Sequence, residues 1–108
     1  WHEFERQALQ KHGLDSSWMR PRYCAGYFGH IFRGEYAGVF YSYLWGDIFA
    51  ADAWDFIQEN GGLTQENGEH LRDKILSLGN SVNFLDAYTA YRGNLADPGA
   101  LLKERGIA

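Results

Sequence analysis

Tyr36, Tyr41 and Tyr43 lie close together in the sequence, and their hydroxyl groups are suited to chemistry. A tyrosine hydroxyl is neutral near pH 7 and donates a hydrogen bond, so it can stabilise a developing oxyanion or hold a peptide group. Tyr36 precedes a predicted helix and Tyr43 follows two helical turns later, so both can point at one site. The alternative, which the residue types alone favour, is that these rings fill a core and their hydroxyls bond to backbone.

His30 and the glycines that follow it are candidates for the same site. An isolated histidine is more often a structural hydrogen-bonding residue than a catalytic one. Gly34 and Gly38 flank Tyr36 and follow Arg33, which predicts a mobile turn where a ligand can approach the backbone. An ordinary helix start fits these residues equally well.

Metal and thiol chemistry have little support in the sequence. The histidines are too widely spaced to form a local zinc pair; they are His2, His12, His30 and His70. His2 and Glu3 imitate the start of a His-Glu-x-x-His motif, but Arg6 stands where the second histidine would be. Cys24 is the only cysteine and has no thiol-protease signature around it. We expect no metal site within these residues.

A long helix from Gly38 to Asn60 must position the tyrosines. Its first half, VFYSYLWGDIF, leaves almost no polar face, so we expect it to be buried on all sides. Its second half carries a polar stripe that includes Asp52 and Asp55, for which we expect a solvated face rather than a catalytic acid pair.

The N-terminal part of the chain predicts one helix and an irregular segment. Residues 3–12 have helical periodicity and are followed by Gly13, a helix-ending residue. Glycines and a proline interrupt residues 14–34, where YFGHIF is either a short strand or an ordered loop.

The C-terminal part predicts three shorter helices. Thr64 can cap the first, Ser81 starts the second with Leu85 and Tyr88 among its inward residues, and Asp97 caps the third. We therefore expect one all-α domain over residues 1–108, with four or five helices.

The composition limits the classes of partner. The net charge is −4 and the basic residues are scattered, which disfavours nucleic acid. No apolar run approaches membrane-spanning length, and we expect a cytoplasmic or, less readily, a periplasmic protein. Aromatic residues make up 17% of the chain, more than packing a domain of this size needs, so some rings should face something outside it. The opening WHEFER lacks an initiator methionine, which suggests a piece of a longer protein.

The segment FGHIFRGEYAGVFYSYLWGDIFAADAW resembles the C-terminal signature of the thimet oligopeptidase and peptidyl-dipeptidase family of zinc metallopeptidases. FERQALQKHGLD, RPRYCAGYFGHIF, GGLTQENGEHLRDKILSLGNS, AYRG and ALLKERGIA resemble the flanking parts of that family, so the resemblance covers nearly the whole chain. The His-Ile-Phe run, the step from His30 to Tyr36 and the closing LLKERGI resemble the bacterial peptidyl-dipeptidases and oligopeptidase A more closely than the animal enzymes.

The resemblance implies a C-terminal part of a mostly helical, two-lobed catalytic domain that encloses a channel. The family's zinc ligands and its general base are absent from these residues, so zinc would belong to the parent protein and not to this chain. Tyr43 would donate to the tetrahedral oxyanion, and His30 would add a donor beside the scissile bond. Tyr36 would contact the substrate backbone or its C-terminal carboxylate, and Tyr41 would belong to the substrate-binding set.

Two departures from the family pattern affect substrate binding. Phe40 stands where relatives usually have a tyrosine, so one hydroxyl is missing. RGE at residues 33–35 replaces a nearly all-glycine run, which should stiffen the loop around Gly34. Arg33 can bind a substrate carboxylate, although a solvated ion pair with Glu35 is the favoured expectation.

Two functions remain open from the sequence. The first is the substrate-facing part of a zinc peptidase of short peptides, which works with a missing N-terminal part of the same chain and is inactive alone. The second is a non-catalytic helical module whose aromatic patch grips a peptide or a partner protein. In either case the apolar half of the long helix should drive self-association of the isolated chain.

Overall fold

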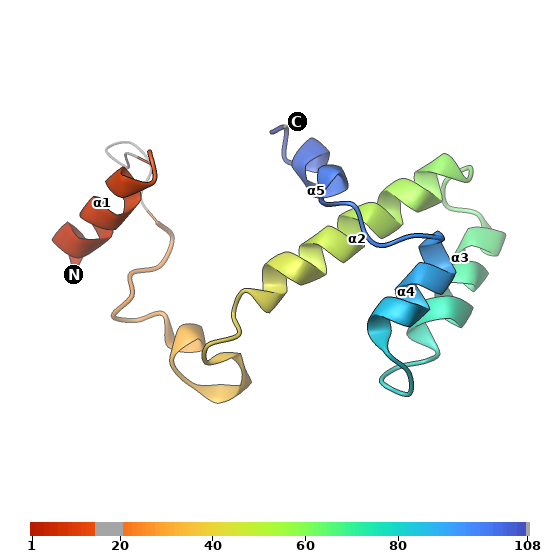
Figure 1. The fold of residues 1–108 in the computed structure, drawn as a ribbon, viewed down its shortest axis with the longest axis horizontal. Coiled ribbons are helices and arrows are strands. Elements are labelled where there is room, and N and C mark those ends of the chain that lie inside the picture. Colours follow the sequence, from red (N-terminus) through yellow and green to blue (C-terminus); the bar gives the residue numbers. More distant parts are fainter. Residues whose placement is uncertain (15–20, 108) are drawn as a thin grey trace. The chain divides into compact units, whose positions relative to one another are not determined.

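The computed structural model describes residues 1–14 and 21–107, and the chain divides into two compact units, Trp1–Tyr41 and Ser42–Ala108. The described residues contain α-helices and short 3-10 and π turns but no strand, which confirms the all-α expectation (Figure 1). The α-helices are α1 (His2–Lys11), α2 (Ser42–Glu59), α3 (Gln65–Leu71), α4 (Phe84–Arg92) and α5 (Pro98–Glu104). None of these helices is both long and apolar enough to cross a membrane.

The first unit begins with the predicted helix. In α1, Glu3 accepts hydrogen bonds from the side chains of Arg6 and Gln7, one turn further along. Such pairs between neighbouring turns stabilise a helix. Of the irregular stretch that follows, residues 15–20 lie outside the described part.

YFGHIF is an ordered loop rather than a strand. It contains a 3-10 turn, η1 (Gly29–Ile31), and a second turn, η2 (Gly34–Tyr36), follows it. These turns place the candidate residues of the first unit.

The long helix of the second unit begins later than predicted. Residues 37–41 form turns, and α2 starts at Ser42 instead of Gly38. Gly38 has φ +75°, a left-handed conformation that cannot continue a right-handed helix. The apolar first half of α2 is also not buried on all sides, because Leu44 is 51% and Trp45 is 55% exposed.

The helix after Thr64 is capped as predicted, but it changes from an α-helix to a π-helix part-way along. The Thr64 hydroxyl accepts the backbone N–H of Asn67 at 3.2 Å. α3 then passes into a π-helical turn, η3 (Arg72–Leu76). Leu71 and Ile75 nevertheless lie on the same side, where they line one pocket with α2 and α4.

Helix α4 begins at a different cap than predicted. Asn83 accepts the backbone N–H groups of Leu85 and Asp86, whereas Ser81 donates to the Leu78 carbonyl before the helix. Leu85 is 49% exposed, so the expectation that it points inward is wrong. Tyr88 is buried as expected, and Tyr91 takes the other inward position.

Helix α5 packs along α2 in the second unit (Figure 1). Asp97 caps it by accepting the Gly99 N–H at 2.8 Å, as predicted. Ala100 and Leu101 form a small core with Ala51, against which Ile48 packs. Because α4 packs on α2 as well, α2 is the element around which this unit is built.

Candidate active site

The first unit brings three of the predicted site residues together. The ring centroid of His30 lies 5.6 Å from that of Tyr36 and 6.2 Å from that of Phe40. Phe28 extends the cluster, with its ring 4.7 Å from Phe40 in an edge-on arrangement. The imidazole and the Tyr36 phenol are therefore polar groups within one aromatic surface.

Glycine allows the turn that carries Tyr36. Gly34 and Gly38 have φ of +73° and +75°, a region that side chains with a Cβ rarely adopt. Apart from the adjoining residues, no atom in the described part of the chain lies within 4 Å of where a Cβ would sit at either position, so conformation rather than space requires glycine there. The predicted turn is thus present, and its mobility stays a prediction.

Arg33 does not form the expected ion pair with Glu35. Both residues are described, and no salt bridge joins them. Arg33 instead lies against Gly29, where an added Cβ would be 3.7 Å from its Nε atom. Since Arg33 is an extended residue before η2 and Glu35 lies within that turn, the sequence proximity of Arg33 and Glu35 is not enough to pair them. Binding of a substrate carboxylate by Arg33 stays a prediction.

Tyr43 lies in the first turn of α2 and is 46% exposed, and Tyr41, just before the helix, is 61% exposed. The spacing argument that linked Tyr36 to Tyr43 by two helical turns is wrong, because residues 37–41 are not helical. Tyr36 and His30 belong to the first unit and Tyr43 to the second. That Tyr36, His30 and Tyr43 act in one site is therefore a proposal, and helix geometry does not support it.

The residues that imitate a zinc motif do not fit one. The Glu3 carboxylate accepts hydrogen bonds from Nε and Nη2 of Arg6 at 2.9 and 2.6 Å. Arg6 stands where the motif has its second histidine, so a cation that pairs with Glu3 takes the place of a zinc ligand. These hydrogen bonds to Arg6 and Gln7 lower the pKa of the Glu3 carboxyl to about 2. A His-Glu-x-x-His zinc site is thus incompatible with this part of α1.

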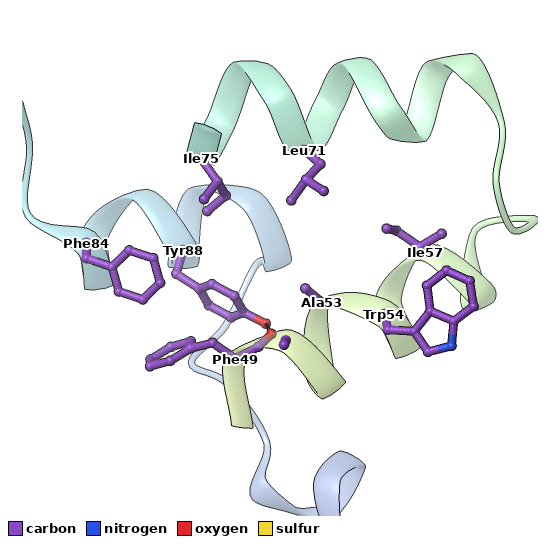
Figure 2. A pocket seen from close by; sticks show the side chains of 9 residues that line it. Phe49, Ala53, Trp54, Ile57, Leu71, Ile75, Phe84 and Tyr88 are labelled. Atoms are coloured by element: carbon purple, nitrogen blue, oxygen red, sulfur yellow. Dashed lines mark hydrogen bonds between the residues drawn. The ribbon is translucent and has the colours of Figure 1, made fainter. Parts of the chain in front are cut away.

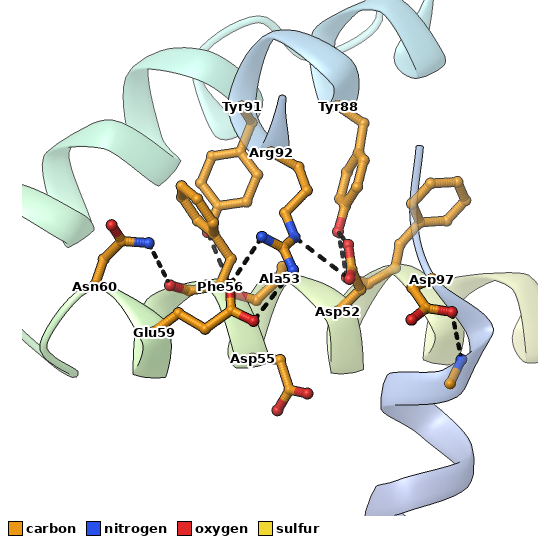
Figure 3. A network of polar contacts seen from close by, with 12 residues as sticks. Asp52, Ala53, Asp55, Phe56, Glu59, Asn60, Tyr88, Tyr91, Arg92 and Asp97 are labelled. Atoms are coloured by element: carbon orange, nitrogen blue, oxygen red, sulfur yellow. Dashed lines mark hydrogen bonds and ion pairs between the residues drawn. The ribbon is translucent and has the colours of Figure 1, made fainter. Parts of the chain in front are cut away.

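Asp52 is the polar residue that sequence reasoning placed wrongly. It is 1% exposed, not solvated, because α4 covers this face of α2. Tyr88 donates a hydrogen bond from Oη to Asp52 Oδ2 at 2.5 Å, and Arg92 Nε approaches Oδ1 at 3.4 Å (Figure 3). Asp55 does remain on the outside, with Lys103 Nζ at 3.4 Å. One signal in the sequence could have indicated this arrangement. Tyr88 and Arg92 are four residues apart and so lie on one helix face, where both can bond to the same carboxylate.

The surroundings of Asp52 set the charge states of its partners. Burial and the hydrogen bond to Asp52 raise the pKa of Tyr88 well above its usual range. Burial acts to lower the pKa of Arg92, but the charges of Asp52 and Glu59 outweigh it and raise that pKa. Arg92 bonds Glu59 at 2.9 Å and lies 5.1 Å from the centre of the Phe56 ring. Tyr88 thus stays protonated and donates a hydrogen bond, and Arg92 stays positively charged. Their bonds to Asp52 and Glu59 hold α4 against α2.

A pocket of about 380 Å³ opens beside this network (Figure 2). Its lining is almost entirely apolar and comes from three helical segments of the second unit: Phe49, Ala50, Ala53, Trp54 and Ile57 of α2, Leu71 and Ile75, and Phe84 and Tyr88 of α4. It offers no convergent polar groups that could carry catalysis. The candidate chemistry therefore lies with the exposed phenols and His30.

Residues 2–107 match Peptidase family M3. This match spans His30, the turn at Gly34 and the start of α2. The chain belongs to this metallopeptidase family. Dipeptidyl carboxypeptidase of Salmonella typhimurium is 45% identical over 97% of the chain, and that of Escherichia coli is 41% identical over the same share. Oligopeptidase A of Escherichia coli is 42% identical over 74% of the chain.

The chain is much shorter than these relatives. It spans 15% of the length of the two dipeptidyl carboxypeptidases and 12% of oligopeptidase A. The expectation of a peptidyl-dipeptidase or oligopeptidase relative is confirmed at the level of family. The roles of individual residues stay predictions.

Proposed function

We propose that this chain is the substrate-binding and oxyanion-stabilising part of a zinc-dependent M3 peptidase that hydrolyses short peptides. The observation that carries the proposal is the position of Tyr43, which is 46% exposed in the first turn of α2 within the segment that matches the family. The match to the dipeptidyl carboxypeptidases covers 97% of the chain, against 74% for oligopeptidase A, and this supports release of C-terminal dipeptides as the reaction.

Tyr43 has the role of oxyanion donor in this proposal. Helix α2 is anchored beyond its first turns by α4 and α5, through Asp52 and the core around Ala51. An anchored helix holds its first residues in a fixed position, and a fixed donor needs no reorganisation when charge develops on the substrate oxygen. Removing one such donor costs about 2.7 to 4 kcal/mol of transition-state stabilisation.

The first unit supplies the peptide-binding surface. His30 donates beside the scissile bond, while Tyr36 and Tyr41 contact the substrate backbone or its C-terminal carboxylate. Phe40 packs against His30 and presents no hydroxyl, so the pocket it borders should accept apolar side chains. In this proposal Arg33 pairs with a substrate carboxylate, which is supported by the lack of a salt bridge between the described residues Arg33 and Glu35.

Zinc, when bound by the parent enzyme, would supply a polarised water as nucleophile, and its ligands and general base would come from other residues. In α1, Arg6 stands where a His-Glu-x-x-His motif has its second histidine, and it pairs with Glu3, so this helix does not supply those ligands. The isolated chain should therefore not hydrolyse peptides.

The direct test is Tyr43→Phe in a full-length M3 peptidase that contains this segment. We expect kcat to fall by about 100-fold or more with the zinc content unchanged. Tyr27→Phe is the matched control, because Tyr27 is also an exposed tyrosine, 65% accessible, and donates to the Arg22 carbonyl. Unchanged turnover in Tyr43→Phe would remove the oxyanion role.

The alternative is a helical module that binds peptides or proteins without catalysis. The exposure of Tyr41, Tyr43 and Trp45 is the observation that favours it. A full-length protein that binds peptides but shows no zinc-dependent cleavage would support this module over the peptidase.

A further inference from the structure

The fold gathers three potential metal ligands that the sequence keeps apart. One ligand atom each of His2, Glu5 and Cys24 lies within 4.8 Å of the other two. His2 and Glu5 are one turn apart on α1, with 3.9 Å between His2 Nδ1 and Glu5 Oε2. Cys24 comes from the segment before η1, so only the packing of that segment on α1 brings its thiol to this face.

A backbone hydrogen bond holds the carboxylate in place. Ala25 donates its N–H to Glu5 Oε1 at 2.8 Å, and this bond joins the start of the chain to the residue next to Cys24. The Glu5 side chain is only 19% exposed, whereas that of His2 is 90% exposed. Glu5 is thus a fixed ligand whose second oxygen remains available, and His2 is a ligand that can turn toward it.

We propose that His2, Glu5 and Cys24 form a binding site for a divalent transition-metal ion, best suited to Zn²⁺. Imidazole, carboxylate and thiolate are all zinc ligands, and bond lengths of about 2.0 to 2.3 Å in a tetrahedron place the ligand atoms about 3.3 to 3.8 Å apart. The observed spacing is at most 4.8 Å, so small rotations of the three side chains would bring the ligand atoms to these distances. A ligand set with sulfur and nitrogen disfavours Mg²⁺ and Ca²⁺, which prefer oxygen.

The spacing of these residues explains why the sequence analysis predicted no metal site here. The sequence pairs His2 with Glu3, but the Glu3 carboxylate turns to Arg6 and Gln7. Glu5, one helical turn from His2, is the glutamate that shares its face. The proposed ion would complete its coordination with water and would tie α1 to the segment around Cys24, in addition to the bond from Ala25.

Metal binding changes the protonation of the ligands in a defined way. The Cys24 thiol must lose its proton to become a thiolate ligand, and the His2 ring must bind in its neutral form. Binding should therefore release a proton from the thiol and weaken as the pH falls. This behaviour does not depend on the proposed peptidase function, so failure of either proposal leaves the other intact.

The test is titration of the reduced 108-residue chain with Zn²⁺ and, as a spectroscopic probe, with Co²⁺. We expect one ion per chain, a sulfur-to-cobalt charge-transfer band, and protection of Cys24 from alkylation. Cys24→Ser should abolish the band. His2→Gln should weaken binding about 10- to 100-fold or more, since loss of a ligand costs at least as much as loss of an outer-shell partner.

Two controls separate the site from adventitious binding. His12→Gln removes an exposed histidine from the end of the same helix and should leave the affinity unchanged. Glu5→Gln keeps an oxygen to accept the Ala25 N–H but removes the charge, so it should weaken metal binding with α1 still in place. Absence of a charge-transfer band in the wild-type chain, or equal losses in His2→Gln and His12→Gln, would overturn the proposal.

Discussion

Tyr88 Oη donates to Asp52 Oδ2 at 2.5 Å and thereby joins α4 to a carboxylate that is 1% exposed on α2. Tyr88 also approaches the Phe49 carbonyl at 3.4 Å, so its hydroxyl lies among acceptors. A buried carboxylate needs such donors, because leaving it without them costs far more than the bond itself contributes. This pair is the central connection of the second unit.

Replacing Tyr88 with Phe should destabilise the chain. The ring can stay in place, but Asp52 loses its hydrogen bond of 2.5 Å and keeps the longer one from Arg92 at 3.4 Å. We expect the free energy of unfolding to fall by about 1 to 3 kcal/mol, measured by urea denaturation. Tyr27→Phe, on the exposed surface, is the control, and equal effects of the two substitutions would contradict the assigned role of the pair.

Asp52→Asn and Asp55→Asn should differ although the residues share one predicted polar stripe. Asp52→Asn weakens a buried pair with Tyr88 and Arg92 and should cost about 1 to 3 kcal/mol. Asp55→Asn affects only a half-exposed pair with Lys103 and should cost about 0 to 1 kcal/mol. Denaturant midpoints of both variants measure the difference, and a solvated Asp52 would give two small and similar values.

The chain should lose stability in alkali through Tyr88. The pKa of Tyr88 is raised by burial and by Asp52, whereas the unfolded chain ionises at the usual tyrosine pKa of about 10. The stabilisation is fully present below that pH and is lost as the pH rises further, because the unfolded state then releases a proton that the folded state retains. Absorbance of tyrosinate followed together with circular dichroism should show Tyr88 ionising only on unfolding. In Tyr88→Phe the alkaline loss of stability should be smaller.

Gly34→Ala should strain the turn before Tyr36. The φ of +73° costs about 1 to 2 kcal/mol for a residue with a Cβ. Gly26→Ala is the matched control, since at both positions the added Cβ meets no described atom within 4 Å beyond the adjoining residues, and Gly26 lacks a positive φ. In the full-length enzyme Gly34→Ala should lower kcat/KM for peptides, and an effect no larger than that of Gly26→Ala would show that the turn geometry is not needed.

The isolated chain should self-associate through the exposed apolar start of α2. Leu44 and Trp45 are more than half exposed there. Such contiguous apolar surface favours association. Sedimentation velocity should show the dimer fraction rising with concentration and falling in Trp45→Gln. A strict monomer at high concentration would contradict this expectation.

Sequence reasoning succeeded where a structure depends on neighbouring residues. Thr64 and Asp97 cap their helices as predicted, because a side chain reaches amides only two or three residues away. The family resemblance likewise rests on a continuous segment, which residues 2–107 confirm. The start of α2 was missed because the conformation of Gly38 opposes the helical pattern that follows it.

The sequence by itself determined that this chain is all-helical, where α1 and α2 end, and the family to which it belongs. Tertiary structure alone decided that Asp52 is buried while Asp55 is not, that Tyr91 rather than Leu85 turns inward, and that Cys24 meets Glu5. The physical reason is that these outcomes depend on which helix face a distant segment covers. Helical periodicity shows only that a face exists, whereas packing determines whether a polar side chain on it meets water or a buried partner.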